Sequence, residues 1–137
     1  MNRLIENGKR KAFHIPFQMT KQFLDMNPNC YFIFGDNTER KGHGGAAQLR
    51  DHSNAIGFVT KRFPSNWDNS FYTLDNYPSV FEGEKFLLTK FIENNPYNWI
   101  LISKLGGGLA NRYHIFENII GPWLETLEKY DNVILLY

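Results

Sequence analysis

The chain has 137 residues, a length that is usual for one domain and sufficient to bury a core on folding. Hydrophobic residues make up 42% and charged residues 21% of the sequence, a composition that excludes a disordered chain. The net charge of +1 indicates that the protein is not a dedicated binder of duplex nucleic acid, a class that normally carries a strong basic excess.

Cysteine and hydropathy patterns indicate an intracellular protein. Cys30 is the single cysteine, so neither an intrachain disulfide nor a CxxC zinc site is expected. No apolar run approaches the length of about 18 residues that a membrane-spanning helix needs. The opening MNRLIENGKRKAF lacks the apolar centre of a signal peptide. We expect a cytoplasmic protein with no membrane partner, no cofactor and no metal, because the histidines lack ligand spacing.

Predicted strands and helices alternate along the chain. Residues 1–10 are polar and are expected to form a loose lead-in to a single domain that spans residues 1–137. Apolar runs predict buried strands at 30–34, 55–60, 99–103 and 133–137, and a short strand at 12–17. Helices are predicted at 20–26, 45–51, 79–93 and from 111 or 113 to 129, with a kink at 121–122.

Two further segments complete the predicted pattern. Residues 63–78 are rich in Asn, Ser, Asp, Trp and Tyr and are expected to be mostly loop, in which Trp67 and Tyr72 could form a lid. The inward side of helix 79–93 is assigned to six apolar residues: Val80, Phe81, Phe86, Leu87, Phe91 and Ile92. The alternation predicts an α/β fold with a mixed or mostly parallel sheet, helices on both faces and a ligand site at the strand carboxyl ends.

Two predicted strands run into glycine-rich loops that are followed by helices, in FIFGDNTERKGHGGAAQLRD and ILISKLGGGLANRYHIFENII. Glycine permits positive φ and close approach of a ligand, so that consecutive N–H groups can converge on an anion. Two such loops at one sheet edge could hold two linked phosphates, although tight turns alone would also explain them. A P-loop is excluded because GxxxxGK[ST] is absent, and the lack of GxGxxG argues against an ordinary Rossmann site.

These motifs resemble the macrodomain family, which binds ADP-ribose. IFGDN followed by GHGGAA is similar to the first strand and glycine loop of that family, and SKLGGGLANRYHIF with DNVILLY is similar to its second loop and last strand. The branch most similar contains terminal ADP-ribose protein glycohydrolases, because IGFVTKRFPS places Lys61 on the catalytic lysine of that branch. The resemblance covers residues 12–137 and implies a three-layer α/β/α fold with a central mixed sheet.

Two positions depart from the family pattern. The acid that follows the GxGL turn in that branch is replaced by Ala110, and Asn111 comes next. The early Asp that binds the adenine amino group is replaced by Gln18, whose side-chain oxygen could accept the same hydrogen bond. Asp36 is then the best remaining carboxylate for a general base, with Asp51 next.

Residue types and the resemblance together assign candidate roles. Lys61 would be a nucleophile, which requires a lowered pKa, or an electrostatic stabiliser. Asp36 would be the base, and His43 would bind an oxyanion or exchange a proton. Each residue also has a purely structural alternative. Lys61 could be a solvated lysine, Asp36 and Asn37 could only favour a turn, and His43 could be an exposed loop histidine. The expected ligand-binding residues are Gln18, Gly35, Asn37, Gly42, Gly44, Gly45, Ala46, Gly106, Gly107, Gly108, Leu109, Ala110, Asn111 and Tyr137.

The expected function is binding of ADP-ribose, or of an ADP-ribosylated macromolecule, with hydrolysis at the anomeric carbon of the distal ribose. A non-catalytic reader or sponge for such nucleotides remains open, because the usual acid is missing at Ala110. A phosphatase of ADP-ribose-1″-phosphate, with His43 or Asp36 assisting water, is a further enzymatic alternative. The most distant alternative is a structural α/β protein whose glycines serve turns alone.

Overall fold

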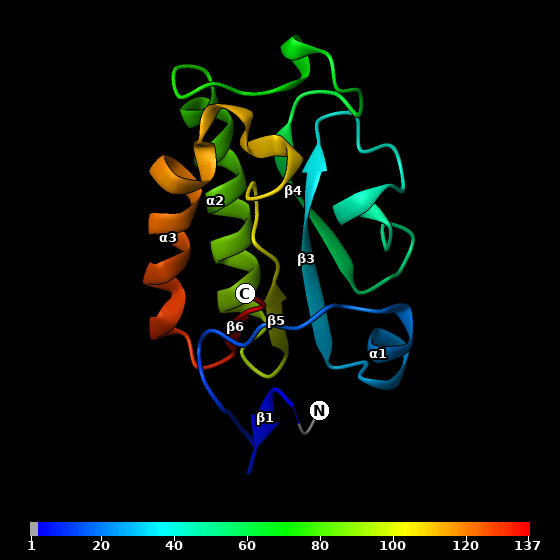
Figure 1. Ribbon diagram of the computed structural model, residues 1–137. Coiled ribbons are helices and arrows are strands. Elements are labelled where there is room, and N and C mark those ends of the chain that lie inside the picture. Colours follow the sequence, from blue (N-terminus) through cyan, green and yellow to red (C-terminus); the bar gives the residue numbers. More distant parts are fainter. Residues whose placement is uncertain (1–2) are drawn as a thin grey trace.

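Four parallel strands form the central sheet of the computed structural model, which describes residues 3–137 (Figure 1). Their order across the sheet is β4 (Ala55–Lys61), β3 (Cys30–Asn37), β5 (Trp99–Ile102) and β6 (Val133–Leu135). The α/β class is therefore confirmed. Of the two alternatives that the alternation left open, the parallel sheet is confirmed, since every pairing between these four strands is parallel. The central mixed sheet that the resemblance implied is wrong for these strands.

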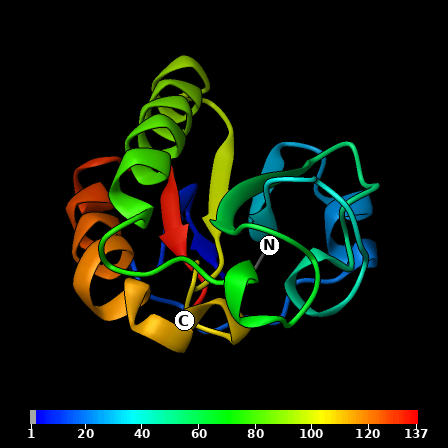
Figure 2. The ribbon, with the colours of Figure 1, turned by 90° about the horizontal axis from the view of Figure 1, so that it is seen from above.

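Side chains that alternate along each strand divide the core into two clusters. Ile33 of β3 packs into the cluster that contains residues of α2 (Tyr77–Asn94) and α3 (Gly121–Glu125). Phe32 and Phe34 pack into the other cluster, together with Leu24 of α1 (Lys21–Met26). The sheet thus lies between two helical layers, as the views from the side and from above show (Figures 1 and 2).

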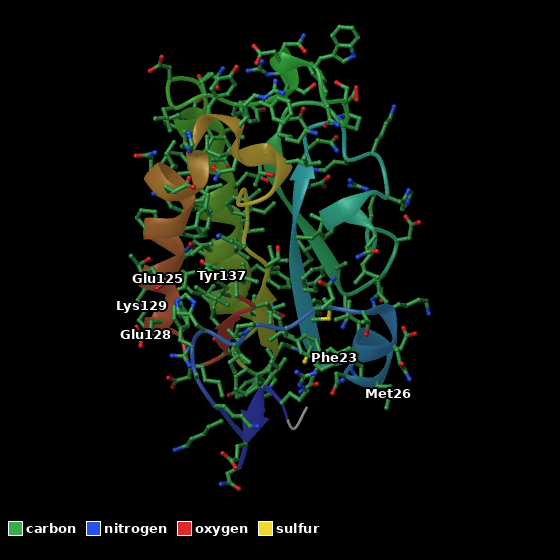
Figure 3. All side chains as sticks on the ribbon, in the orientation of Figure 1. Phe23, Met26, Glu125, Glu128, Lys129 and Tyr137 are labelled. Atoms are coloured by element: carbon green, nitrogen blue, oxygen red, sulfur yellow. The ribbon has the colours of Figure 1, made fainter. Side chains whose placement is uncertain are left out.

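Labelled side chains follow the same division. Glu125 and Tyr137 lie on the side of α3, and Phe23 and Met26 of α1 lie on the opposite side (Figure 3). The predicted helix at 20–26 is confirmed as α1, whose first turn is capped by the Thr20 hydroxyl accepting from the Phe23 N–H.

Helix α2 begins at Tyr77 rather than at the expected Ser79, with Pro78 in its first turn. Tyr77 is fully buried, and its hydroxyl donates to the carbonyl of Val59 at 2.6 Å, while the N–H of Val59 donates to the Glu84 carboxylate. The buried face consists of Tyr77, Phe81, Leu88 and Ile92. Phe86 and Leu87 are more than 60% exposed, so their inward assignment was wrong; helical periodicity turns them away from that face.

The other helical predictions are only partly met. The expected helix at 45–51 is one 3-10 turn, η1 (Gly45–Ala47). The polar loop contains a single 3-10 turn, η2 (Asp68–Ser70). The last helix is divided into η3 (Leu109–Tyr113), the π-helical η4 (Phe116–Ile120), α3 and η5 (Thr126–Lys129). The π-helical η4 ends at Ile120, and Gly121 and Pro122 begin α3. Pro122 therefore lies in the first turn of α3, where a residue without an N–H donor is tolerated.

The amino-terminal segment is more ordered than its polar sequence suggests. Strands β1 (Ile5–Glu6) and β2 (Lys9–Arg10) form an antiparallel hairpin instead of a loose lead-in, and Leu4 is fully buried; residues 1–2 lie outside the described residues. The expected strand at 12–17 is reduced to one parallel bridge between His14 and Leu135. No helix within residues 3–137 is long and apolar enough to span a membrane.

Candidate functional site

One cavity of about 490 Å³ lies at the carboxyl ends of β3, β4 and β5 and is lined by both glycine loops. Ligands of open parallel sheets bind at this end of the strands. Most of the residues assigned to the site from sequence line it: Gly35, Asp36, Asn37, Gly42, Gly44, Gly45, Ala46, Lys61, Gly106, Gly108, Leu109 and Ala110. The expectation that the two loops share one cleft therefore holds.

Asp36 ends β3 as a buried carboxylate with an arginine on each side. Its side chain is 2% exposed, and Arg50 donates to its two oxygens at 2.6 and 2.9 Å, while Arg40 donates at 3.2 Å. Burial alone would raise the pKa of the Asp36 carboxyl, but hydrogen bonds from Arg50, the Asn37 N–H and Arg40 hold it below its usual value. A carboxylate in this state is a poor general base at neutral pH.

Asn37 and Arg50 shape the first glycine loop from within. The Asn37 amide donates to the carbonyl of Lys41 at 2.8 Å, and its oxygen accepts from the Glu39 N–H at 3.1 Å. Arg50 donates through Nε to the carbonyl of Gly42 at 2.8 Å and through Nη2 to that of Lys41 at 3.1 Å. Asp36 and Asn37 thus stabilise the turn, which was the structural alternative to a functional role, and both residues also line the cavity.

The second glycine loop rests on the core. Gly106 has φ +77°, and a Cβ at this position would lie 2.7 Å from Cδ1 of the buried Ile120. Only glycine accepts this combination of backbone angle and close packing. Gly107 leaves room for the stem of Lys104, whose Cγ would lie 2.6 Å from an added Cβ.

Lysines give the cavity a positive character. Lys41, Lys61 and Lys104 line it, and within residues 3–137 the only acidic side chain lining it is Asp36, which is paired with arginine. Lys61 Nζ donates to the Asn66 side chain at 3.3 Å. Burial lowers the pKa of the Lys61 ammonium from its usual value, and this shift favours the neutral amine that a nucleophile requires.

Several predicted site residues lie outside the lining. His43 is exposed and pairs with Asp51 at 2.8 Å, and Gln18 is also exposed. Asn111 donates to the Glu117 carboxylate at 2.8 Å and accepts at 2.9 Å from the N–H of Phe116, the first residue of η4. Gly107 acts through Lys104 rather than by lining the cavity.

Tyr137 adjoins the site through Lys104, which lines the cavity and whose Nζ lies 6.0 Å from the centroid of the Tyr137 ring. Its ring lies 5.8 Å from that of Phe116, edge to face, and Lys104 Nζ lies 4.8 Å from the Phe116 centroid. Burial raises the pKa of Tyr137 to about 12, which keeps the phenol neutral. Phe116 and Tyr137 are therefore packed against one another beside Lys104.

The polar loop after β4 contributes to the mouth of the cavity. Pro64 and Asn66 line it, and the adjacent Trp67 is 78% exposed. Asp68 accepts from Tyr113 and from Arg112, which ties this loop to the segment that follows the second glycine loop. Tyr72 is buried in the core, so of the two lid candidates only Trp67 lies on the surface.

Sequence reasoning missed part of the lining. Thr60 and Ser103 lie where β4 and β5 end, and Lys41 and Lys104 add charge. The signal was available, because residues at the carboxyl ends of neighbouring parallel strands meet at one sheet edge. Within residues 3–137, no group of three or more His, Cys, Asp or Glu side chains could hold a metal ion.

Comparison with known proteins adds a family but no activity. No curated protein and no solved structure matches the chain. A family model matches residues 15–110, a range that contains both glycine loops and every residue that lines the cavity. On this match the chain belongs to a family of unknown function, DUF7831.

Proposed function

We propose that this protein binds ADP-ribose or a close derivative in the glycine-loop cavity. The observation that carries the proposal is the joint lining of one cavity by two glycine loops and three lysines, Lys41, Lys61 and Lys104. Backbone N–H groups and ammonium groups together match the oxygens and charge of a diphosphate. The volume of about 490 Å³ lies in the range of small-molecule sites. The macrodomain-like motifs supply the choice of ADP-ribose among diphosphates.

We further propose hydrolysis at the anomeric carbon of the distal ribose, with Lys61 as nucleophile. The neutral amine adds to that carbon, the bond to the leaving group breaks, and the proton lost by the nitrogen passes to the leaving group. The resulting glycosylamine opens its ribose ring to an imine, which borohydride can reduce. Water otherwise hydrolyses the imine, releases ADP-ribose and restores the amine. The lowered pKa of Lys61 supports this role. Asp36 is not proposed as the base, because both of its oxygens already accept from Arg50.

A non-catalytic reader is the second candidate, and two observations favour it. Asp36 is held by arginines, and Ala110 stands where the related branch has an acid. A site that has neither carboxylate available could bind without turnover. The same cavity and the same ligand serve both candidates, so binding and turnover require separate tests.

Binding is tested by calorimetry with ADP-ribose, with ADP and AMP as controls. We expect ADP-ribose to bind most tightly and Lys61→Gln to weaken its binding about tenfold, a change of about 1.4 kcal/mol. Lys21→Gln is the matched control, because Lys21 lies on α1, pairs with Asp25 and does not line the cavity. Equal affinity for all three nucleotides, or none at millimolar concentration, would refute the proposed ligand.

Turnover is tested with an ADP-ribosylated protein and borohydride. We expect release of ADP-ribose and a trapped adduct that peptide mass spectrometry locates on Lys61. Binding without release would support the reader. Release that continues in Lys61→Gln would rule out the covalent mechanism while leaving the ligand in place.

A further inference from the structure

The wall between two cavities contains an ion pair with an unassigned role. Asp36 lines both the glycine-loop cavity and a groove of about 500 Å³ beside β4, whereas Arg50 lines the groove alone. Arg50 is 13% exposed and is not among the residues that line the glycine-loop cavity.

The contacts of Arg50 orient the peptide groups of the loop. It draws the carbonyls of Lys41 and Gly42 toward itself at 3.1 and 2.8 Å. The carbonyl and N–H of a planar trans peptide point in opposite directions. The N–H groups of Gly42 and His43 are therefore turned away from Arg50, and Lys41 and Gly42 themselves line the cavity.

Asp36 in turn fixes Arg50. The carboxylate holds the guanidinium through both oxygens, a geometry that leaves little freedom of rotation. The floor beneath the carboxylate is closed, because a Cβ at Gly57 would lie 2.2 Å from Oδ2 of Asp36. The chain from Gly57 through Asp36 to Arg50 is thus packed and bonded at each step.

We propose that Arg50, held by Asp36, is a positioning residue: it directs the N–H groups of the first glycine loop toward the anion and so sets phosphate affinity without touching the ligand. The inference rests on the proposed function in taking the ligand to be a phosphate-bearing anion. It assigns Asp36 to the architecture of the anion site in place of proton transfer.

The test compares Arg50→Lys with Arg40→Lys. A lysine at position 50 keeps the charge but cannot bond both carboxylate oxygens and two carbonyls at once. Arg40 shares the Asp36 partner, but its other contacts are the carbonyl of Gly57 and the Glu84 carboxylate. Calorimetry with pyrophosphate and with ADP-ribose, well below the melting temperature, is combined with hydrogen exchange of the ligand-free protein.

We expect Arg50→Lys to weaken both anions at least tenfold and to speed exchange of the amides at 42–46 alone, while Arg40→Lys stays within twofold of the wild type. Wild-type affinity and exchange in Arg50→Lys would overturn the inference. Faster exchange throughout the chain would also overturn it, since the effect would then be general destabilisation. If the wild type binds neither anion, the proposed function fails; exchange confined to 42–46 then still supports the orienting contact, and unchanged exchange rejects it.

Discussion

The two glycine loops reach the same cavity but are held by different forces. The loop after β3 is mostly exposed, and its shape depends on hydrogen bonds from Asn37 and from Arg50, which is paired with Asp36. The loop after β5 lies on the core, and its shape depends on the fit of Gly106 against Ile120. We call the Asp36–Arg50 contacts the polar clamp and the turn at Gly106 the packed turn. The polar clamp is sensitive to the loss of one charge, whereas the packed turn is sensitive to added volume. Two glycine-rich loops can therefore be disrupted by different kinds of substitution.

The largest expected effect is the loss of unfolding free energy when the polar clamp is removed. Asp36→Ala leaves the guanidinium of Arg50, which is 13% exposed, without its carboxylate. Removing one partner of a buried pair costs about 3–5 kcal/mol of unfolding free energy, which chemical denaturation would measure. Asp51→Ala is the matched control, because that carboxylate is 83% exposed and should matter by less than about 1 kcal/mol. Equal losses in the two variants would mean that the clamp does not hold the loop.

The packed turn is broken by volume. Gly106→Ala places a Cβ at positive φ and 2.7 Å from Cδ1 of Ile120. Backbone strain and overpacking together should cost about 2–3 kcal/mol of unfolding free energy in thermal or urea denaturation. Gly44→Ala in the other loop has φ −86° and no atom within 4 Å of the new Cβ, so its stability should change by less than about 0.5 kcal/mol. The reverse order would contradict the division into clamped and packed loops.

A smaller effect compares the contributions of the loops to ligand affinity. The stem of Lys104 lies across Gly107 and its ammonium lies over the ring of Phe116, whereas Lys41 is exposed. An ordered cation loses less freedom on binding, so Lys104→Gln should weaken ADP-ribose about tenfold and Lys41→Gln about threefold. Calorimetry at two salt concentrations checks both numbers. A larger loss from Lys41→Gln would locate the stronger phosphate contact in the first loop.

The smallest effect concerns pH and the surroundings of Tyr137, beside the second loop. The hydrogen bond that the His14 ring donates to the Glu125 carboxylate raises the pKa of His14 above its usual value. Because the folded-state pKa is raised, the pair stabilises the fold fully below the unfolded pKa, and that contribution is lost as pH rises through the folded pKa. The pair is on the surface, so the change should stay below about 1 kcal/mol. Melting temperatures between about pH 5.5 and 8.5 would show it.

Two variants isolate the His14 contribution. His14→Gln and Glu125→Gln each remove one partner of the pair, so both should abolish this part of the pH dependence. A wild-type slope in both variants would assign the dependence to other groups.

Sequence patterns within a single segment predicted the buried strands and the start of the first helix. The continuous apolar runs at 30–34 and 55–60 are confirmed as β3 and β4, and Thr20 caps α1. The amino-terminal hairpin was missed because its strands are two residues long and mostly polar. The face of α2 was misjudged at Phe86 and Leu87, since apolar content alone does not tell which side of a helix meets the sheet.

The site was predicted in outline but not in its internal contacts. Glycines that follow predicted strands indicated both loops. Because ligands of parallel sheets bind at the carboxyl ends of the strands, the two loops were expected at one site, and both line the same cavity. The partner of Asp36 could not be read from the sequence, because Arg50 lies fourteen positions away across an irregular loop that no periodicity describes. Asp36 therefore looked like an available base, although the fold uses its charge internally.

The outer margin of β4 has a consequence for association between chains. Strand β4 ends the sheet order, yet its Val59 N–H is bonded to Glu84, its Val59 carbonyl to Tyr77, and its Gly57 carbonyl to Arg40. Beyond Val59, Lys61 is bridged to Phe71. A strand from another molecule would have to displace these side chains before it could pair with the backbone of β4. Three side chains from elsewhere in the same chain thus protect this edge against intermolecular β-sheet extension.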